Sequence, residues 1–402
     1  MEEKQTAGTA APQAPAPQPG QGHRRHRVLL LTPSRPSGDF PASTYIRLLR
    51  PLTHESVADM IEIVPVGLEA ALAEPAHALV VQRMAIPDER SAEALLRRCR
   101  TAGLRKVFEL DDDLLENPPE FLRHSEGFTE RRAAARLFAS GADAITVTTP
   151  VLHTLLDSLF AAPVHLVPNA LDERLWLNEA STAGASVLAA THHAIHKAGR
   201  LLQRQAQIRL LYMGTASHHR DLQTLREPVE RLKREYGRGV RLDVIGATNE
   251  ESNESWFGLI TIPRYAQTNY PAFVGWLRGL TGYHIGVAPL LDSPFNRAKS
   301  NLKYLDYCGL GLAPVVSDGP SFANIVAHGE TGFLVSESVD TWYATLKRLI
   351  EEESIRESIR ANARADLIGN HTLAAQALQR RAAWCRILDI DPDNRFIPER
   401  TN

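Results

Sequence analysis

A lysine-bearing segment, Phe295 to Asp318, combines cations and a carboxylate at helical spacing. Its polar residues gather at the predicted start of a helix, where unpaired backbone N–H groups and the helix dipole favour a bound anion. They are Asn296, Arg297, Lys299, Ser300 and Lys303. Asp306 follows Lys303 by one helical turn and shares its face. The segment therefore offers cations to a diphosphate and a carboxylate to ribose or sugar hydroxyls, as a nucleotide sugar would require.

Acidic residues follow the predicted strand KVFEL directly. Asp111 and Asp112 thus stand where parallel α/β sheets bind their ligands, beyond the carboxyl ends of the strands. A carboxylate there could stabilise a transition state with oxocarbenium character or orient a hydroxyl group. The same triplet, completed by Asp113, could instead hold a metal ion or cap the next helix. We expect one member to cap, and we take Asp111, Asp112 and Asp306 as the candidate catalytic residues.

The loop after IRLLYMG is the second candidate phosphate site. Gly214 ends this strand without a Cβ, so a phosphate can approach the backbone closely. Arg220 lies six residues further on and could add a positive charge. An ordinary strand-to-helix turn is the alternative. The roles of His218 and His219 stay open, and nothing nearby completes a metal-binding set around them.

Two rounds of alternating strand-like and helical segments must position these residues. Such alternation is typical of doubly wound parallel sheets. It stops after the first round and begins again later in the chain, which predicts two similar α/β domains. We expect a disordered tail over 1–26, an N-terminal domain over 27–177 and an interdomain linker over 178–207. A C-terminal domain over 208–367 and a final helix and tail over 368–402 follow. The cleft between the domains is the expected site.

Composition narrows the function classes. The chain has 402 residues with a net charge of -2 and a pI near 6.7, which gives no reason to expect a nucleic-acid partner. Its three cysteines are widely spaced, as suits a reducing cytoplasm, and no apolar run approaches the length of a membrane span. We expect a cytoplasmic protein. The basic cluster at 23–27 would allow peripheral contact at the inner membrane face. The favoured interpretation is that these residues simply face solvent just before the first strand.

Four motifs carry a resemblance to a known family. They are VPNALD at 167–172, YMGTASHHRDL at 212–222, the segment 285–318 ending in GLAPVVSD, and HGETGFLV at 328–335. The chain from about Arg27 to Leu367 resembles bacterial glycosyltransferases of the GT-B fold, close to the retaining glycosyltransferase family 4. The resemblance implies two Rossmann-like domains that face each other across a cleft.

The resemblance also implies roles. Such enzymes bind a nucleoside diphosphate sugar mainly on the C-terminal domain and an acceptor, here saccharide or lipid-linked, mainly on the N-terminal one. It implies no metal and no further cofactor, because Arg and Lys neutralise the leaving diphosphate. The donor-binding positions become Gly214, Arg220, Asn296, Lys299, Lys303 and Asp306. The acceptor-binding positions become Gly38, Arg47 and Arg83.

The chain departs from the family pattern at three positions. Ala298 replaces the first of two family glutamates, Asp306 replaces the second, and Thr215 stands where an arginine usually faces the diphosphate. These losses keep two alternatives open: a non-catalytic nucleotide-sugar-binding or scaffold subunit of a transferase, and a same-fold nucleotide-sugar epimerase. The sequence does not identify the sugar, the nucleotide base or the acceptor.

Overall fold

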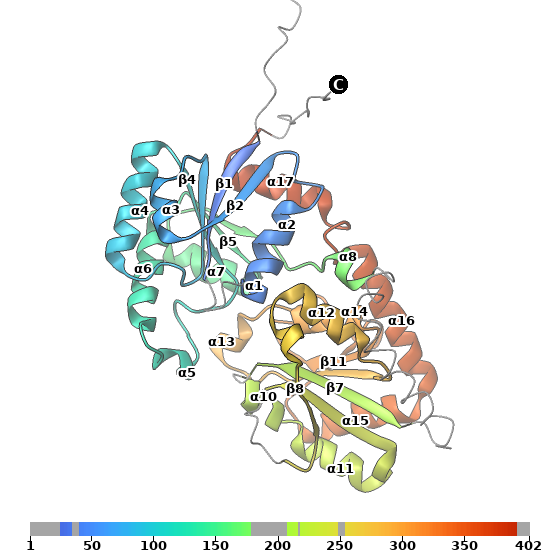
Figure 1. Cartoon of the computed structure of the whole chain (residues 1–402). Coiled ribbons are helices and arrows are strands. Elements are labelled where there is room, and N and C mark those ends of the chain that lie inside the picture. Colours follow the sequence, from blue (N-terminus) through green and yellow to red (C-terminus); the bar gives the residue numbers. More distant parts are fainter. Residues whose placement is uncertain (1–24, 34–39, 178–206, 216–217, 248–253, 392–402) are drawn as a thin grey trace, which may run out of the picture.

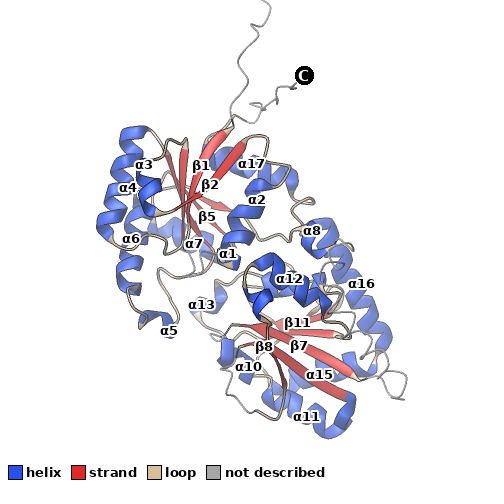
Figure 2. Ribbon diagram, viewed as in Figure 1, coloured by secondary structure: helices blue, strands red, loops and turns tan. Residues whose placement is uncertain are grey.

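Two parallel sheets of six strands each organise the computed structural model (Figure 1), which describes residues 25–33, 40–177, 207–215, 218–247 and 254–391. Helices cover both faces of each sheet (Figure 2). Most strands are short apolar runs with both faces buried, which is what parallel sheets require. The two-domain α/β architecture expected from the alternating pattern is confirmed.

The N-terminal sheet has the strand order β2-β1-β3-β4-β5-β6. Its strands are β1 (His26–Leu31), β2 (Ile61–Val66), β3 (Ala78–Gln82), β4 (Arg105–Leu110), β5 (Ala144–Val147) and β6 (Val164–Leu166). The first strand thus begins at His26, within the range that we assigned to the tail. All pairs are parallel, so the carboxyl ends of β1, β3 and β4 lie along one edge. Asp111 and Asp112 follow β4 at this edge.

Helices pack on both faces of the N-terminal sheet. One face buries α3 (Leu68–Ala73), α4 (Glu89–Ala102), α6 (Phe128–Ser140) and α7 (Pro150–Leu159) in a common apolar cluster. The other face carries α2 (Arg50–Thr53). Before α2, a short helix α1 (Ala42–Thr44) runs into a π-helical turn, η1 (Tyr45–Leu49). Turns of this kind are common at functional sites. A single helical turn, α5 (Glu120–Arg123), lies between β4 and α6.

The C-terminal sheet repeats this plan with the order β12-β11-β10-β7-β8-β9. Its strands are β7 (Ile208–Gly214), β8 (Val240–Gly246), β9 (Gly258–Ile260), β10 (Ile285–Ala288), β11 (Ala313–Ser317) and β12 (Phe333–Val335). Helices α11 (Arg226–Tyr236) and α15 (Val339–Glu351) pack on one face. Helices α12 (Tyr270–Gly279) and α14 (Leu302–Gly309) pack on the other. The remaining turns are α10 (His219–Gln223), η4 (Gly237–Gly239), η5 (Arg264–Gln267) and α13 (Pro294–Arg297).

Two segments cross between the domains. The first includes α8 (Glu173–Trp176), and residues 178–206 of the predicted linker lie outside the described part of the chain. The second returns from α16 (Glu353–Asn370) to α17 (Ala377–Leu388), which packs on the N-terminal sheet (Figure 1). Trp384 of α17 is buried in the same apolar cluster as Val28 and Leu30 of β1. The end of the chain therefore completes the core of the domain in which the chain begins.

The domains also exchange side chains across the cleft. Ile46 of the N-terminal domain is 7% exposed and belongs to an apolar cluster of the C-terminal domain. Ala298 of the C-terminal domain is fully buried in the main cluster of the N-terminal domain. The cleft is therefore closed around this contact.

Candidate functional site

A pocket of about 240 Å³ lies between the two domains. Arg83, Asp111 and Asp112 line it from the N-terminal domain, at the carboxyl ends of β3 and β4. His218, Lys299 and Lys303 line it from the C-terminal domain. Five of these six residues were candidate site residues in the sequence analysis. The fold brings together groups that lie up to 220 positions apart in the chain, from Arg83 to Lys303.

Lys303 lies in the first turn of α14 and sends a buried amine towards this pocket. Its Nζ atom has no hydrogen-bond partner among the described residues and lies 5.1 Å from the centre of the Tyr212 ring. Burial lowers the pKa of Lys303 to about 7, and nearby Lys299 adds to this effect. An anion entering the pocket would supply the missing counter-charge.

Asp306 follows on the same helix, as the spacing predicts. Burial raises the pKa of Asp306 to about 8, against the opposing effect of Lys303. Its Oδ1 atom is buried and has no hydrogen-bond partner among the described residues. Asp306 is not among the residues that line the pocket, whereas Lys303 and Asp111 are. Asp306 therefore lies further from the pocket than Lys303. A buried, unsatisfied carboxyl oxygen is suited to receive a hydroxyl group of a ligand.

Arg83 clamps the two carboxylates of the opposite wall. Its Nε atom lies 3.1 Å from Asp111 Oδ1, and its Nη2 atom lies 3.4 Å from Asp112 Oδ2. The φ angle of Arg83 is 52°, a left-handed conformation that side-chain-bearing residues seldom adopt outside functional sites. Arg83, which was predicted to bind the acceptor, lines the pocket and pairs with both acidic residues.

The two carboxylates differ in pKa. Burial raises the pKa of Asp111 to about 6, against the effect of Arg83. Burial acts in the same direction on Asp112, but Lys299 and Arg83 outweigh it and hold the pKa of Asp112 below its usual value. Lys299 reaches Asp112 from the other domain, with 3.9 Å between Nζ and Oδ1. Asp112 is therefore a stable anion at neutral pH, whereas Asp111 titrates closer to neutrality.

A network of buried hydrogen bonds surrounds Glu109, on the strand that precedes Asp111 and Asp112. Arg47 is 3% exposed and donates to Glu109 over 2.7 Å, to the Val167 carbonyl over 2.6 Å and to Asn169 over 3.1 Å. Gln82 donates to the other oxygen of Glu109 over 2.8 Å. With its charge already paired and its donors engaged, Arg47 fits a supporting role better than the predicted acceptor contact. Asn169 accepts from Arg47 and also lines the pocket.

His218 is the residue that the sequence left open, and it lines the pocket. Its Nδ1 atom lies 2.7 Å from Asp221 Oδ2, and the carboxylate can only accept, so Nδ1 carries the proton. Burial lowers the pKa of His218 to about 4, with Lys303 adding to this effect and the hydrogen bond to Asp221 opposing it. His218 is therefore neutral at pH 7. The spacing of three residues between His218 and Asp221 was the available sequence signal.

Gly214 and Gly246 meet at the carboxyl ends of β7 and β8. Gly246 has a φ of 65°, and a Cβ atom on it would lie 2.1 Å from the Gly214 carbonyl oxygen. Only glycine fits this backbone contact. The pair keeps the strand ends close together below the loop that carries His218. The sequence marked Gly214 for phosphate contact but gave no sign of its partner.

Two predicted donor contacts lie away from the pocket. Arg220 is exposed in α10 and lines an outer groove instead. Asn296 donates to Asp221 over 3.1 Å and to the Leu291 carbonyl over 2.9 Å, so its amide braces the loop. The helix predicted for this segment is split into α13 and α14, and Lys299 and Ser300 lie in the turn between them. Gly38 lies outside the described residues.

The expectation that one acid of the triplet caps the next helix is wrong, because α5 begins at Glu120 and Pro119 is its N-cap, without a side-chain cap bond. Asp113 stabilises the loop before this helix instead. It is 1% exposed and accepts from the backbone N–H of Glu116 over 2.9 Å and from the Asn117 side chain. Among the described residues, no group of three or more His, Cys, Asp or Glu side chains is arranged to hold a metal ion. In the same part of the chain, no helix combines the length and the apolar character needed to cross a bilayer.

Comparisons with known proteins place this geometry in context. The family model described as "Glycosyl transferases group 1" matches residues 207–352, which comprise most of the C-terminal domain. No curated protein sequence matches the chain significantly.

Solved structures resemble the whole chain. Sucrose-phosphate synthase from Thermosynechococcus elongatus superimposes with a TM-score of 0.59 at 11% identity, over 91% of this chain and 100% of the other. Anabaena HepE in complex with UDP-glucose gives a TM-score of 0.56 at 12% identity, over 90% and 100% of the two chains. A glycosyltransferase from Rickettsia africae gives 0.52 at 8% identity, over 92% and 100%. The chain has the GT-B fold, as expected.

Proposed function

We propose that this protein is a retaining glycosyltransferase of bacterial glycan biosynthesis. It transfers a sugar from a nucleoside diphosphate sugar to a saccharide or lipid-linked acceptor. The observation that carries the proposal is the buried amine of Lys303, which has no hydrogen-bond partner among the described residues and lies on the wall opposite the acidic pair. The match of the C-terminal domain to group 1 glycosyl transferases supports it. So does the fold shared with HepE, which binds UDP-glucose.

The diphosphate would bind against Lys299 and Lys303. These two amines would stabilise the negative charge that grows on the leaving group, because both line the same pocket. His218, neutral and oriented by Asp221, can exchange a hydrogen bond with a phosphate oxygen or a sugar hydroxyl without adding charge. Asp306 would accept from donor hydroxyls behind Lys303.

The transfer itself would proceed on one face of the sugar. The acceptor oxygen bonds to the anomeric carbon while the bond from that carbon to the leaving phosphate oxygen breaks, and the hydroxyl proton passes to the leaving diphosphate. Asp112, held as an anion by Lys299 and Arg83, stabilises the positive charge that develops on the sugar ring. Asp111, with a pKa of about 6, is suited to orient a hydroxyl by hydrogen bonding.

A panel of nucleotide sugars tests the proposal. We expect the purified full chain to bind one nucleoside diphosphate selectively and to hydrolyse its sugar conjugate slowly when no acceptor is present. Asp112→Asn should keep the nucleotide affinity and lose most of the hydrolysis, because the amide cannot stabilise a cationic sugar. If no nucleotide in the panel binds, the proposal is wrong.

A non-catalytic nucleotide-sugar-binding or scaffold subunit is the second candidate. The observation that favours it is Ala298, which occupies the position of the first family glutamate and is fully buried against the N-terminal domain. Selective nucleotide binding without hydrolysis of any conjugate would support this candidate. An epimerase would instead release a changed nucleotide sugar, which chromatography of the incubation mixture would detect.

A further inference from the structure

A groove of about 1070 Å³ lies at the mouth of the cleft. Residues of the segment 117–124 line it from the N-terminal domain, and residues of α10 and of the segment 291–299 line it from the C-terminal domain. Lys299 lines both this groove and the smaller pocket. A molecule in the groove would therefore lie directly beside the predicted reaction centre.

Aromatic and proline side chains give the groove apolar surfaces. Phe121 of α5 is 54% exposed, and among the described residues its ring stacks on no other aromatic ring. Phe295 lies on the opposite wall, with Lys299 Nζ 4.5 Å from the centre of its ring. An exposed aromatic ring in a concave site provides a flat apolar surface with little loss of conformational entropy on binding. The C–H faces of a pyranose ring fit such a surface.

The charged groups that line the groove are balanced in number: Arg123, Arg220 and Lys299 stand against Glu120, Asp221 and Asp292. Arg123 and Arg220 are exposed, and neither forms an ion pair with any residue that the structure describes. The nearby carboxylates are mostly engaged: Asp292 pairs with Arg297, and buried Asp221 accepts from His218. Glu120 is the remaining acid of the lining. An anionic group is thus the complement that these arginines lack.

We propose that the groove binds the acceptor, and that the acceptor is a saccharide carrying an acidic group, either a carboxylate or a phosphate. This rests on the proposed transferase function. Phe121 would receive a sugar ring, while Arg123 and Arg220 would bind the anion. The proposal moves acceptor recognition away from Arg47 and Arg83, whose guanidinium groups already bind protein carboxylates.

Saccharide binding to the full chain, saturated with the nucleotide it selects, tests this proposal. The acidic probes are a tetrasaccharide of alternating glucuronic acid and N-acetylglucosamine, for the carboxylate, and N-acetylglucosamine 1-phosphate, for the phosphate. The neutral probe is the N-acetylglucosamine tetrasaccharide. We expect at least one acidic probe to bind ten times more tightly than the neutral one. Phe121→Ala and Arg123→Gln should each weaken that binding about tenfold.

Controls separate this proposal from the transferase assignment. Arg100→Gln, at an exposed arginine of α4, and Leu378→Ala, at a side chain 83% exposed on α17, should leave saccharide affinity unchanged. Nucleotide affinity and slow donor hydrolysis should be unchanged in all four variants, because these residues lie outside the donor pocket. Equal binding of neutral and acidic probes, no binding of any probe, competition by the nucleotide, or intact affinity in both groove variants would overturn the proposal. Loss of nucleotide binding itself would instead contradict the transferase function.

Discussion

Two buried groups of opposite type, Lys303 and Asp306, dominate the chemistry of the C-terminal wall. Each carries a buried polar atom without a hydrogen-bond partner among the described residues, and such atoms are rare in folded proteins. Burying an amine or a carboxyl group without a partner costs stability, so a ligand that supplies the partners would bind favourably here. The arrangement makes sense if a ligand completes it. Donor binding would then satisfy the amine with phosphate oxygens and the carboxyl group with hydroxyls.

Replacing Lys303 with methionine should separate binding from folding. Lys303→Met keeps the length of the side chain and removes the amine, so we expect affinity for the selected nucleoside diphosphate to fall at least tenfold. The melting temperature should stay the same or rise, because a buried amine is replaced by an apolar group. Lys233→Met, at a half-buried lysine of α11 outside the pocket, whose amine donates to the Ser255 carbonyl over 2.9 Å, is the matched control and should leave nucleotide affinity unchanged. Equal losses of affinity and stability in Lys303→Met would contradict the assignment.

The same amine should couple donor binding to proton uptake. With a pKa of about 7 in the free protein, Lys303 is partly neutral at pH 7 and mostly neutral at pH 8, and a bound diphosphate favours its charged form. Binding at pH 8 should therefore take up a proton, and affinity should fall as pH rises from 7 to 9. Calorimetry in two buffers of different ionisation enthalpy measures the uptake.

Asp306 is the control for this proton linkage. Its pKa of about 8 means that it could lose a proton when donor hydroxyls bind, which would mask uptake by Lys303. In Asp306→Asn that release is absent, so the uptake should persist and become easier to resolve. Binding heats that are independent of the buffer in this variant, with constant affinity from pH 6 to 9, would exclude Lys303 as the titrating group.

At the scale of elements, the segment between β10 and α14 behaves as a bridge between domains. The Thr149 hydroxyl donates to the Ala298 carbonyl over 3.0 Å, and the Ala298 side chain is buried in the N-terminal core. Ala298 therefore makes a packing contact that joins the two domains.

Introducing a glutamate at this position should open the protein rather than activate it. In Ala298→Glu a carboxylate would be forced into an apolar cluster, at a cost of several kcal/mol if the cleft stayed closed. We expect the domains to separate, with a larger radius of gyration in small-angle scattering and lower donor affinity. Ala298→Ser adds a single hydroxyl and should change both measurements much less. A gain of donor hydrolysis in Ala298→Glu would show that the closed contact is dispensable.

The elements themselves were largely predictable, whereas several contacts were not. Runs such as IRLLYMG and VRLDVIG read directly as buried strands, and β7 and β8 match them. Asp111 and Asp112 were found because residues after parallel strands meet at one edge of a sheet. The left-handed conformation of Arg83 and the return of α17 to the first domain depend on distant packing that no local pattern encodes. For the same reason the sequence assigned Arg47 to a ligand rather than to Glu109.

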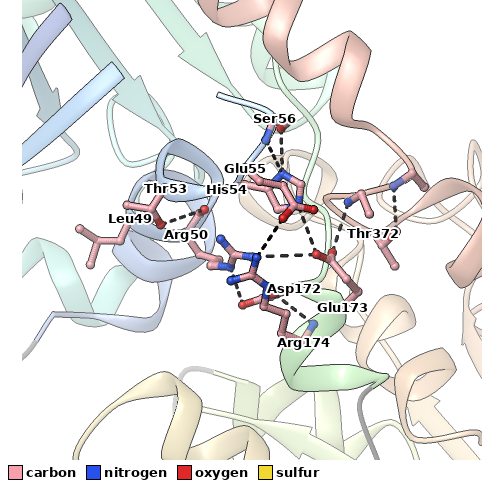
Figure 3. A network of polar contacts seen from close by, with 12 residues as sticks. Leu49, Arg50, Thr53, His54, Glu55, Ser56, Asp172, Glu173, Arg174 and Thr372 are labelled. Atoms are coloured by element: carbon pink, nitrogen blue, oxygen red, sulfur yellow. Dashed lines mark hydrogen bonds and ion pairs between the residues drawn. The ribbon is translucent and has the colours of Figure 1, made fainter. Parts of the chain in front are cut away.

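Across the whole molecule, domain closure depends on the two segments that cross between the domains. Figure 3 shows how the first of them is held to the N-terminal domain: Arg50 of α2 pairs with Asp172 over 2.7 Å, and His54 contacts Glu173 over 3.1 Å. Glu173 also accepts from the backbone N–H of Ala374, on the returning segment, over 3.2 Å. Backbone bonds of Leu171 with His371 and Leu373 fasten the two segments directly. We call these two joined segments the hinge. Because they are bonded to each other, we expect them to move together when the domains open or close.

Breaking the central ion pair should loosen this hinge. Asp172→Asn leaves Arg50, which is 8% exposed, without its close carboxylate, so we expect the free energy of unfolding to fall by about 3 kcal/mol. Glu55→Gln removes the exposed partner of Arg174 and should cost less than about 0.5 kcal/mol. Denaturant titrations measure both changes. In the double variant Arg50→Met with Asp172→Leu, stability should largely return, because no buried charge remains unpaired.

Amide exchange would show whether the loosened hinge governs the cleft. In Asp172→Asn, exchange should accelerate in η1, α2 and α8, and also in the distant segment 295–299, because that bridge holds only while the domains are closed. Saturating nucleotide should restore protection at 295–299 if donor binding and closure are coupled, since a ligand shifts the balance towards the state it binds better. Acceleration confined to the hinge, with 295–299 unaffected, would mean that the cleft contacts hold the domains together without help from the crossing segments.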